Sequence, residues 1–260
     1  ILTVDIESGE IKSYIGNSDC NNTGEGTDVD VIHAPRSSGS ILKPLLYAKA
    51  YDDGMIAPNS LIPDVPIRIA GYAPKNFDKS YSGAVTSEDA LTRSLNIPAV
   101  KLLQDFGLPK FHDLLQDLDF RTVNKSADHY GLSLILGGAE VTLFDLVNAY
   151  RGLSKSLKTY VESDSQYDAA DFDPIHFEKT EKPQSQLSDR SVIDAGAIWQ
   201  MLEVLSNVER PRAEAGWKSF SNGRKIAWKT GTSFGHRDAW AVGMDGKHVV
   251  GVWIGNADGE

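Results

Sequence analysis

Three short motifs carry side chains suited to acyl transfer through a serine. The first is Ser-Ile-Leu-Lys, from Ser40 to Lys43. The apolar residues after Pro44 predict a helix that begins here, because proline is tolerated only in a first helical turn. Ser40 and Lys43 then share one helical face. Free N–H groups at a helix start stabilise developing negative charge, and a neutral lysine there can take the proton of a nucleophilic serine.

The second motif is Ser94-Leu95-Asn96. It lies between a predicted helix capped by Thr86 and another that begins around Pro98, since proline is favoured in a first turn. Side chains at such a break can point into a cleft. Taken alone, the first two motifs are more often helix caps and a solvated lysine than catalytic groups.

The third motif is Lys229-Thr230-Gly231-Thr232-Ser233, at the end of a predicted strand. Threonine hydroxyls and a lysine ammonium suit a carboxylate ligand, and Gly231 permits close approach of another backbone. Taken alone, the motif is also typical of a surface strand. Alternation places Thr230 and Thr232 on one face and Lys229 on the other. We therefore expect the strand to line a site along its edge, with Lys229 curling round.

Hydrophobic patterning predicts the elements that position these motifs. Alternating residues predict a β-hairpin near each end of the chain, one from Leu2–Ile6 and Glu10–Gly16, the other from Ala239–Met244 and His248–Ile254 around Asp245-Gly246. Between them, helices are predicted by capping boxes and amphipathic spacing, at Thr86, at Thr142 and over Val192–Val208. The polar stretch Lys155–Arg190 predicts a long surface connection with little regular structure.

Strands at both ends with helices between them predict an α+β fold. Its expected form is a mostly antiparallel sheet flanked by helices, with a helical lobe inserted between the terminal hairpins. We expect a single domain over residues 1–260. Its sheet lobe would cover about 1–50 and 186–260, and its helical lobe about 51–185.

Composition narrows the classes of function. Twenty-six basic against 36 acidic residues give a net charge of −10, which argues against a nucleic-acid partner and requires a local positive site for any anionic substrate. The one cysteine, Cys20, excludes an intrachain disulfide, and its polar surroundings offer no cationic neighbour to activate it. Isolated histidines predict no metal site. No apolar run approaches the roughly 18 to 20 residues of a membrane span.

The three motifs in this order form a highly specific combination. With them the sequence resembles the transpeptidase domain of class A penicillin-binding proteins, and it is most similar to the penicillin-binding protein 1C subgroup. The resemblance covers nearly the whole chain. It also rests on four further segments, Val4–Glu10, Ala90–Val100, Gly131–Thr142 and Arg237–Gly243.

The resemblance implies a serine-type D-Ala-D-Ala transpeptidase that cross-links peptidoglycan stem peptides and is acylated and inhibited by β-lactam antibiotics such as penicillins. It implies no cofactor or metal. Ser40 would be the nucleophile and Lys43 its base. Ser94 would relay a proton to the leaving amine, and Asn96 would hold the substrate amide and Lys43.

The resemblance also assigns the third motif. Lys229, Thr230 and Thr232 would bind the terminal carboxylate of the substrate, with Gly231 between the threonines in the same substrate-binding strand. The N–H groups of Ser40 and Thr232 would form an oxyanion hole.

Members of this class usually carry a membrane anchor and a glycosyltransferase domain ahead of the transpeptidase. We therefore expect the full-length protein to lie at the periplasmic face of the bacterial inner membrane, with this fragment soluble. The family usually has a further helix after the last strand. This chain ends at Glu260 and is expected to lack it.

Other functions share parts of the pattern. A non-catalytic β-lactam sensor or a serine β-lactamase carries all three motifs. A hydrolase nucleophile elbow is a further alternative, because Gly231–Gly235 matches G-x-S-x-G, with Asp238 and His248 downstream. That elbow requires a helix directly after Ser233, where the sequence predicts a β-hairpin.

Overall fold

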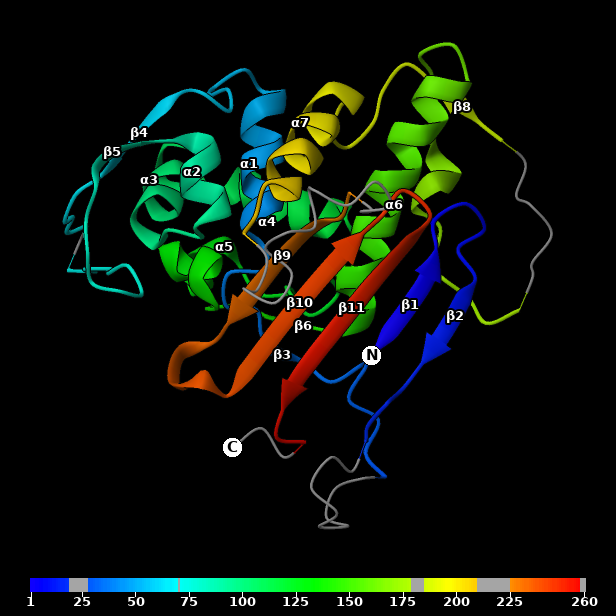
Figure 1. Ribbon diagram of the computed structural model, residues 1–260, viewed down its shortest axis with the longest axis horizontal. Helices are drawn as coiled ribbons and strands as arrows, with labels where there is room; N and C mark the ends of the chain where they lie inside the picture. The colour runs from blue at the N-terminus through cyan, green and yellow to red at the C-terminus, as the bar shows by residue number, and fades with distance from the viewer. Residues whose placement is uncertain (19–27, 70, 179–184, 210–224, 258–260) are drawn as a thin grey trace.

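A central antiparallel sheet brings the two ends of the chain together (Figure 1). The computed structural model describes residues 1–18, 28–69, 71–178, 185–209 and 225–257. The sheet has five strands in the order β2-β1-β11-β10-β9. They are β1 (Leu2–Asp5), β2 (Ile11–Tyr14), β9 (Ala227–Thr232), β10 (Asp238–Met244) and β11 (His248–Gly255). Both predicted hairpins are confirmed, and they are joined because β1 pairs with β11.

Two helices pack against this sheet, and a third packs against one of them. The helix α6 (Leu143–Glu162) contacts β1 and β11, α7 (Ala195–Ser206) contacts β9, and α1 (Lys43–Asp52) contacts α7. Their apolar side chains join those of the strands in one core, in which Leu2, Val4 and Val249 are fully buried. The predicted α+β class, with helices between terminal hairpins, is confirmed.

Shorter elements complete the described part of the chain. The further helices are α2 (Ser87–Thr92), α3 (Asn96–Phe106), α4 (Leu108–Asp117) and α5 (Ala127–Tyr130). The 3-10 turns are η1 (Gly131–Leu136), η2 (Ala169–Phe172) and η5 (Phe234–His236). Short strands pair as β3 (Arg36–Ser37) with β6 (Glu140–Val141), β4 (Leu61–Asp64) with β5 (Gly83–Thr86), and β7 (Tyr167–Asp168) with β8 (Leu187–Ser188). The division into a sheet lobe and a helical lobe stays a prediction.

Both predicted capping boxes are confirmed on their N-cap side. The Thr86 hydroxyl accepts a hydrogen bond from Asp89 N at the start of α2, and the Thr142 hydroxyl accepts one from Asp145 N at the start of α6. The helix predicted over 192–208 is also present. It begins at Ala195, because the preceding residue has an extended backbone and serves as the N-cap.

The prediction of a largely irregular connection over Lys155–Arg190 is wrong at its start. The helix α6 continues to Glu162. Its last turns bury small polar side chains instead of apolar ones: Ser156 hydrogen-bonds to Ser191, and Thr159 donates to Asp171 Oδ1. Because these partners satisfy the buried hydroxyls, a polar sequence here still makes a packed helix face.

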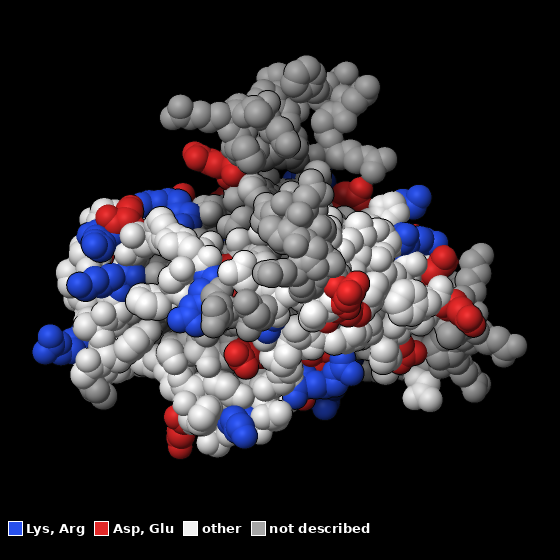
Figure 2. All heavy atoms as spheres, turned by 90° about the horizontal axis from the view of Figure 1, so that it is seen from below, with Lys and Arg blue, Asp and Glu red and all other residues white. Residues whose placement is uncertain are grey.

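The surface mixes charges of both signs. On the face seen in Figure 2, Lys and Arg side chains are interspersed with Asp and Glu side chains. The described residues of this face therefore form no extended positive surface, and an anionic ligand would need a small cluster of positive groups at its own binding site. Cys20 lies outside the described residues.

Close packing between α6 and β11 yields a test of the fold. A Cβ at Gly251 would press against Val147 Cγ2 and lie 2.8 Å from Leu143 Cδ1. We expect Gly251→Val to lower the free energy of unfolding by about 1–3 kcal/mol, despite the strand preference of valine. Gly196→Ala in α7 is the matched control: a Cβ there meets nothing within 4 Å, so stability should stay level or rise. Denaturant titrations measure the free energy of unfolding of both variants. A Gly251→Val protein as stable as the wild type would contradict this packing.

Candidate active site

Ser40 lies in the turn that leads into α1. The first helical residue is Lys43, with Pro44 in the first turn, as the motif predicts. Lys43 N donates to Ser40 O at 3.3 Å. Tyr150 OH in α6 donates to Ile41 O at 3.3 Å, and this hydrogen bond connects the turn to α6. Ser40 is partly exposed, whereas Lys43 is fully buried.

The Lys43 amine points at the break between α2 and α3. Its Nζ donates to Ser94 O at 2.8 Å, to Leu95 O at 3.1 Å and to Asn96 Oδ1 at 2.7 Å. Ser94 has a φ of +57°, a left-handed conformation that is uncommon outside glycine. The predicted break between the two helices is confirmed, but α3 begins at Asn96, two residues before the predicted start near Pro98. The break presents two successive carbonyls to one buried amine. Among the described residues, no hydrogen bond joins Ser40 Oγ to this amine.

Lys229 approaches the same break from β9. Its Nζ donates to Ser94 Oγ at 2.8 Å and to Thr230 O at 2.6 Å. The predicted alternation is confirmed, because Lys229 and Gly231 are buried whereas Thr230 and Thr232 are exposed. Ser94 thus joins the two lysines: its carbonyl accepts from Lys43 and its hydroxyl accepts from Lys229.

Two glycines let β9 touch the turn that holds Ser40. A Cβ on Gly231 would lie 3.0 Å from Ser38 O and 3.1 Å from Ile41 N. A Cβ on Gly39, whose φ is +51°, would lie 2.6 Å from Thr232 O and 2.9 Å from Thr232 N. A side chain at Gly39 would clash with the backbone of β9, and one at Gly231 would be tighter than an ordinary contact, so the turn and the strand lie in direct contact.

Burial dominates the electrostatics of both lysines. Lys43 is 0% and Lys229 2% exposed, and among the described residues no carboxylate forms a salt bridge with either. Burial, with the nearby Lys229 ammonium, holds the pKa of Lys43 well below its usual value. Burial lowers the pKa of Lys229 to about 7. The three acceptors around Lys43 Nζ favour its charged form, but neutral acceptors offset only part of the desolvation of an ammonium.

Several residues that support the site carry no signal in the sequence. Trp240 Nε1 in β10 donates to Ser37 O at 2.8 Å, beside the first motif. Asn76, in the segment between β4 and β5, is 3% exposed and accepts a hydrogen bond from Asn96 N at 2.9 Å. An asparagine in a polar stretch is typical of a turn, so its type alone indicates nothing about the second motif.

The nucleophile-elbow alternative is wrong. Ser233 is buried, and its Oγ accepts from Asp238 N at 2.9 Å. The three-residue turn η5 follows it and leads into β10, which pairs antiparallel with β9. The helix required after such a serine is therefore replaced by a hairpin. In the described part of the chain, no group of three His, Cys, Asp or Glu residues could hold a metal.

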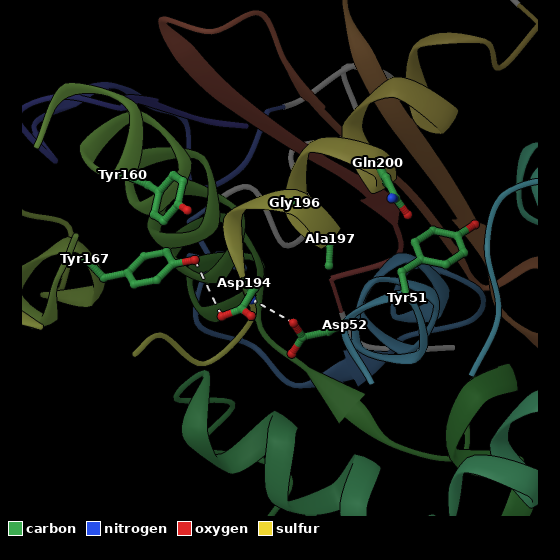
Figure 3. A pocket seen from close by; sticks show the side chains of 8 residues that line it. All are labelled: Tyr51, Asp52, Tyr160, Tyr167, Asp194, Gly196, Ala197 and Gln200. Carbon is green, nitrogen blue, oxygen red and sulfur yellow. Dashed lines mark hydrogen bonds between the residues drawn. The ribbon is translucent and has the colours of Figure 1, made fainter. Parts of the chain in front are cut away.

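A separate hollow of about 310 Å³ opens at the other end of α1 (Figure 3). It contains none of the motif residues, and its lining includes Tyr51, Asp52, Tyr167 and Asp194. Its carboxylates are already engaged: Asp52 pairs with Lys49 and accepts from Asp194 N, and Asp194 Oδ1 accepts from Tyr167 OH. We therefore place the candidate chemistry at the three motifs and not here.

The comparison with known families agrees with this geometry. Residues 1–257 match the family described as the penicillin-binding protein transpeptidase domain. The chain belongs to this family. It is 33% identical to penicillin-binding protein 1C of Escherichia coli strain K12 over 259 residues, which are 100% of this chain and 31% of that protein. It is 28% identical to penicillin-binding protein 1A of Neisseria cinerea, over 98% of this chain and 32% of that one. The predicted resemblance to this family and to its 1C subgroup is confirmed.

Solved structures of the family share the fold. The PonA1 protein from Mycobacterium tuberculosis in complex with penicillin V is 20% identical, with a TM-score of 0.76 over 100% of this chain and 69% of that one. The chain spans about a third of the length of the curated relatives described above. Within the residues described, no helix has both the length and the hydropathy of a membrane span.

The buried Lys229 amine predicts how stability depends on pH. Between pH 7 and the ordinary lysine pKa of 10.5, the unfolded chain holds a proton that folded Lys229 has released. The free energy of unfolding therefore contains a term that rises with pH, by at most about 1.4 kcal/mol per pH unit. Lys229→Met removes this term, so the difference between wild type and variant should grow in favour of the wild type from pH 7.5 to 9.5. Denaturant titrations at several pH values measure it, and parallel curves would contradict a lowered pKa.

Proposed function

We propose that this domain is a serine-type D-Ala-D-Ala transpeptidase acting on peptidoglycan stem peptides. The observation that carries the proposal is the double role of Ser94, which accepts from Lys43 through its carbonyl and from Lys229 through its hydroxyl. A base for Ser40 and a cation for a carboxylate thereby meet beside one turn. Family membership supports transpeptidase chemistry at this place.

Acylation begins with the Lys43 amine in its neutral form. An ammonium donates to all three of its present acceptors, whereas a neutral amine donates two hydrogens and has one lone pair. One acceptor is therefore released when Lys43 becomes the base. Ser40 Oγ loses its proton to this lone pair as it attacks the penultimate D-Ala carbonyl. The N–H groups of Ser40 and Thr232 stabilise the resulting oxyanion.

Collapse of the tetrahedral intermediate breaks the peptide C–N bond and leaves an ester on Ser40. The proton on Lys43 passes through the Ser94 hydroxyl to the departing D-Ala amine. The amine of a neighbouring stem peptide then attacks the ester and loses its proton to Lys43. Ser40 recovers a proton as the new peptide bond forms, so no water or cofactor is consumed.

Charge complementarity supports a binding site for the substrate terminus on β9. The chain has a net charge of −10, yet Lys229 and the exposed Thr230 and Thr232 offer a cation and two hydroxyl donors on one short strand. A bound carboxylate favours the charged form of Lys229 and raises its pKa above 7. Asn96 carries a second amide hydrogen beyond the one used in the free protein, and this can hold the substrate amide.

The wider setting follows from the same proposal. β-Lactams acylate Ser40 as analogues of the donor. The full-length protein carries a membrane anchor and a glycosyltransferase domain and works at the periplasmic face of the inner membrane. The short share of each relative that the chain spans is consistent with such further domains.

Covalent labelling tests the nucleophile. Incubation with a penicillin should add one acyl group, and peptide mapping should place it on the peptide that contains Ser40. Ser40→Ala should abolish the adduct, since loss of a nucleophilic serine costs on the order of 10⁶ in turnover. Ser233→Ala is the matched control and should keep the adduct. Labelling that survives Ser40→Ala would overturn the proposal.

The lifetime of the adduct separates the transpeptidase from a β-lactamase. A lactamase needs a group that activates water against the acyl-serine, such as a glutamate. Glu88 and Asp89, beside the second motif in sequence, belong to the first turn of α2, and Glu140 is exposed in β6. None of the three is a clear candidate for this role, so we expect the ester to last from many minutes to hours in water. Nitrocefin should give about one equivalent of product per enzyme. Sustained turnover of nitrocefin would contradict the transpeptidase assignment and support a β-lactamase. Acylation by the donor without transfer to an amine would support a sensor.

The carboxylate role of β9 predicts a selective defect. Thr230→Val with Thr232→Val removes two hydroxyl donors while keeping the strand shape. Acylation by a carboxylate-bearing ligand should fall roughly 10-fold or more, since a hydrogen bond to a charged group contributes about 1.5–3 kcal/mol. An amidated analogue of the same ligand should be affected far less. Equal losses for both ligands, measured as acylation rate constants, would remove the threonines from carboxylate binding.

A further inference from the structure

A buried polar chain runs from β4 to the first turn of α3. Asp64 at the end of β4 is fully buried, and Asn76 is nearly so. Asn76 Nδ2 donates to Asp64 Oδ1 at 2.7 Å and to Ser80 O at 2.9 Å. Asp64 Oδ2 accepts from Ser82 N at 2.8 Å. Because both carboxylate oxygens accept hydrogen bonds, Asp64 is held in place and fixes the orientation of the Asn76 amide.

The other end of this amide holds the second motif. Asn76 Oδ1 accepts from Asn96 N at 2.9 Å and from Ile97 N at 3.2 Å. N–H groups in the first turn of a helix have no acceptor within the helix, and the N-cap residue of α3, Leu95, has no side chain that could accept from them. A residue far away in the sequence therefore supplies the missing cap.

The same segment also sets the orientation of the Asn96 amide. Asn96 Nδ2 donates to Lys75 O at 2.8 Å, while Asn96 Oδ1 accepts from Lys43 Nζ at 2.7 Å. A carbonyl can only accept and an ammonium can only donate. With Lys75 O on one side, the Asn96 oxygen must face Lys43. A flipped amide would lose the bond to Lys75 O in either state of Lys43, and both bonds when Lys43 is an ammonium.

We infer that Asp64 and Asn76 are positioning residues that hold the Asn96 amide against Lys43 through the 75–76 segment. The inference rests on the proposed function, since it assigns Asn96 and Lys43 to the reaction. Asp64 and Asn76 touch neither substrate nor Ser40. They act by fixing the first turn of α3 and the acceptor that faces the base.

If Asp64 and Asn76 position the Asn96 amide against Lys43, their loss should change the pH dependence of acylation. Residues that only stabilise the fold should not change it. In the described part of the chain, the charged group that faces Lys43 is Lys229 from β9. The α2–α3 break faces Lys43 with two carbonyls and the Asn96 amide. Loss of the amide acceptor destabilises the ammonium form of Lys43. The acid limb of acylation should therefore move to lower pH, by up to about one unit, while the maximal rate falls.

The first experiment measures acylation by a penicillin as a function of pH in the wild type, Asn76→Ala and Asn148→Ala. Asn148 is the matched control: it is also buried, and its Oδ1 also accepts from a backbone N–H, that of Ile175, away from the motifs. We expect Asn76→Ala to acylate about 100-fold more slowly with a shifted limb, as a displacement of about 1 Å can cause. Asn148→Ala should keep the wild-type limb, whatever its stability. An unshifted limb in Asn76→Ala, or an equal shift in both variants, would overturn the inference.

A reciprocal exchange provides the second arm. Asn76→Asp sets two carboxylates against each other. Asp64→Asn leaves one acceptor for two donors, so its NH2 group must face either Asn76 Nδ2 or Ser82 N. The double variant Asp64→Asn with Asn76→Asp restores one donor and one acceptor between the positions. We expect both single variants to acylate slowly and the double variant to recover at least tenfold over Asn76→Asp. A double variant no faster than Asn76→Asp would overturn the pairing, even where a single variant folds poorly.

Wild-type labelling separates the two levels of the argument. If the wild-type protein forms no penicillin adduct on Ser40, the proposed function itself is wrong. If the wild type is labelled normally, and Asn76→Ala is labelled at the same rate with the same acid limb in its pH profile, only the positioning role is wrong.

Discussion

The site depends on one constraint: two lysine amines are buried, and among the described residues neither has a carboxylate partner. Desolvation of an ammonium is costly, and a second cation nearby raises that cost. In the part of the chain that is described, Lys43 and Lys229 are held by backbone carbonyls, one hydroxyl and one amide instead. These neutral partners keep the amines in place without restoring an ordinary pKa. The site can therefore contain a base at one position and an anion-binding cation at the other.

The fold is arranged around this pair of amines. Lys43 enters from the start of α1 and Lys229 from the edge strand β9, and both end at the break between α2 and α3. The left-handed backbone of Ser94 turns its carbonyl and hydroxyl to different lysines. Gly39 and Gly231 allow the strand and the turn to touch. Each element contributes one contact that the others lack, so the site exists only when the helices and the sheet are assembled.

Local patterns in the sequence predicted much of this arrangement. Alternation along β9, the capped helix before Ser94 and the proline near the start of α3 were sufficient to predict the strand faces and the break. The convergence of three motifs came from a family resemblance, since spacing alone leaves each motif open to a structural explanation. The Asp64–Asn76 chain was not predictable, because its partners are 12 to 20 residues apart and join through irregular backbone. The end of α6 was missed because its buried face is polar.

The central claim is that Lys43 acts as a neutral base, and the pH dependence of acylation tests it most directly. The rate constant for penicillin acylation should rise with pH through a pKa well below that of an ordinary lysine, and then level off. Lys43→Arg keeps the charge, but guanidinium does not deprotonate in proteins, so acylation should be nearly lost at every pH. A Lys43→Arg protein that acylates at close to the wild-type rate, or a wild-type rate that does not change with pH, would contradict the account.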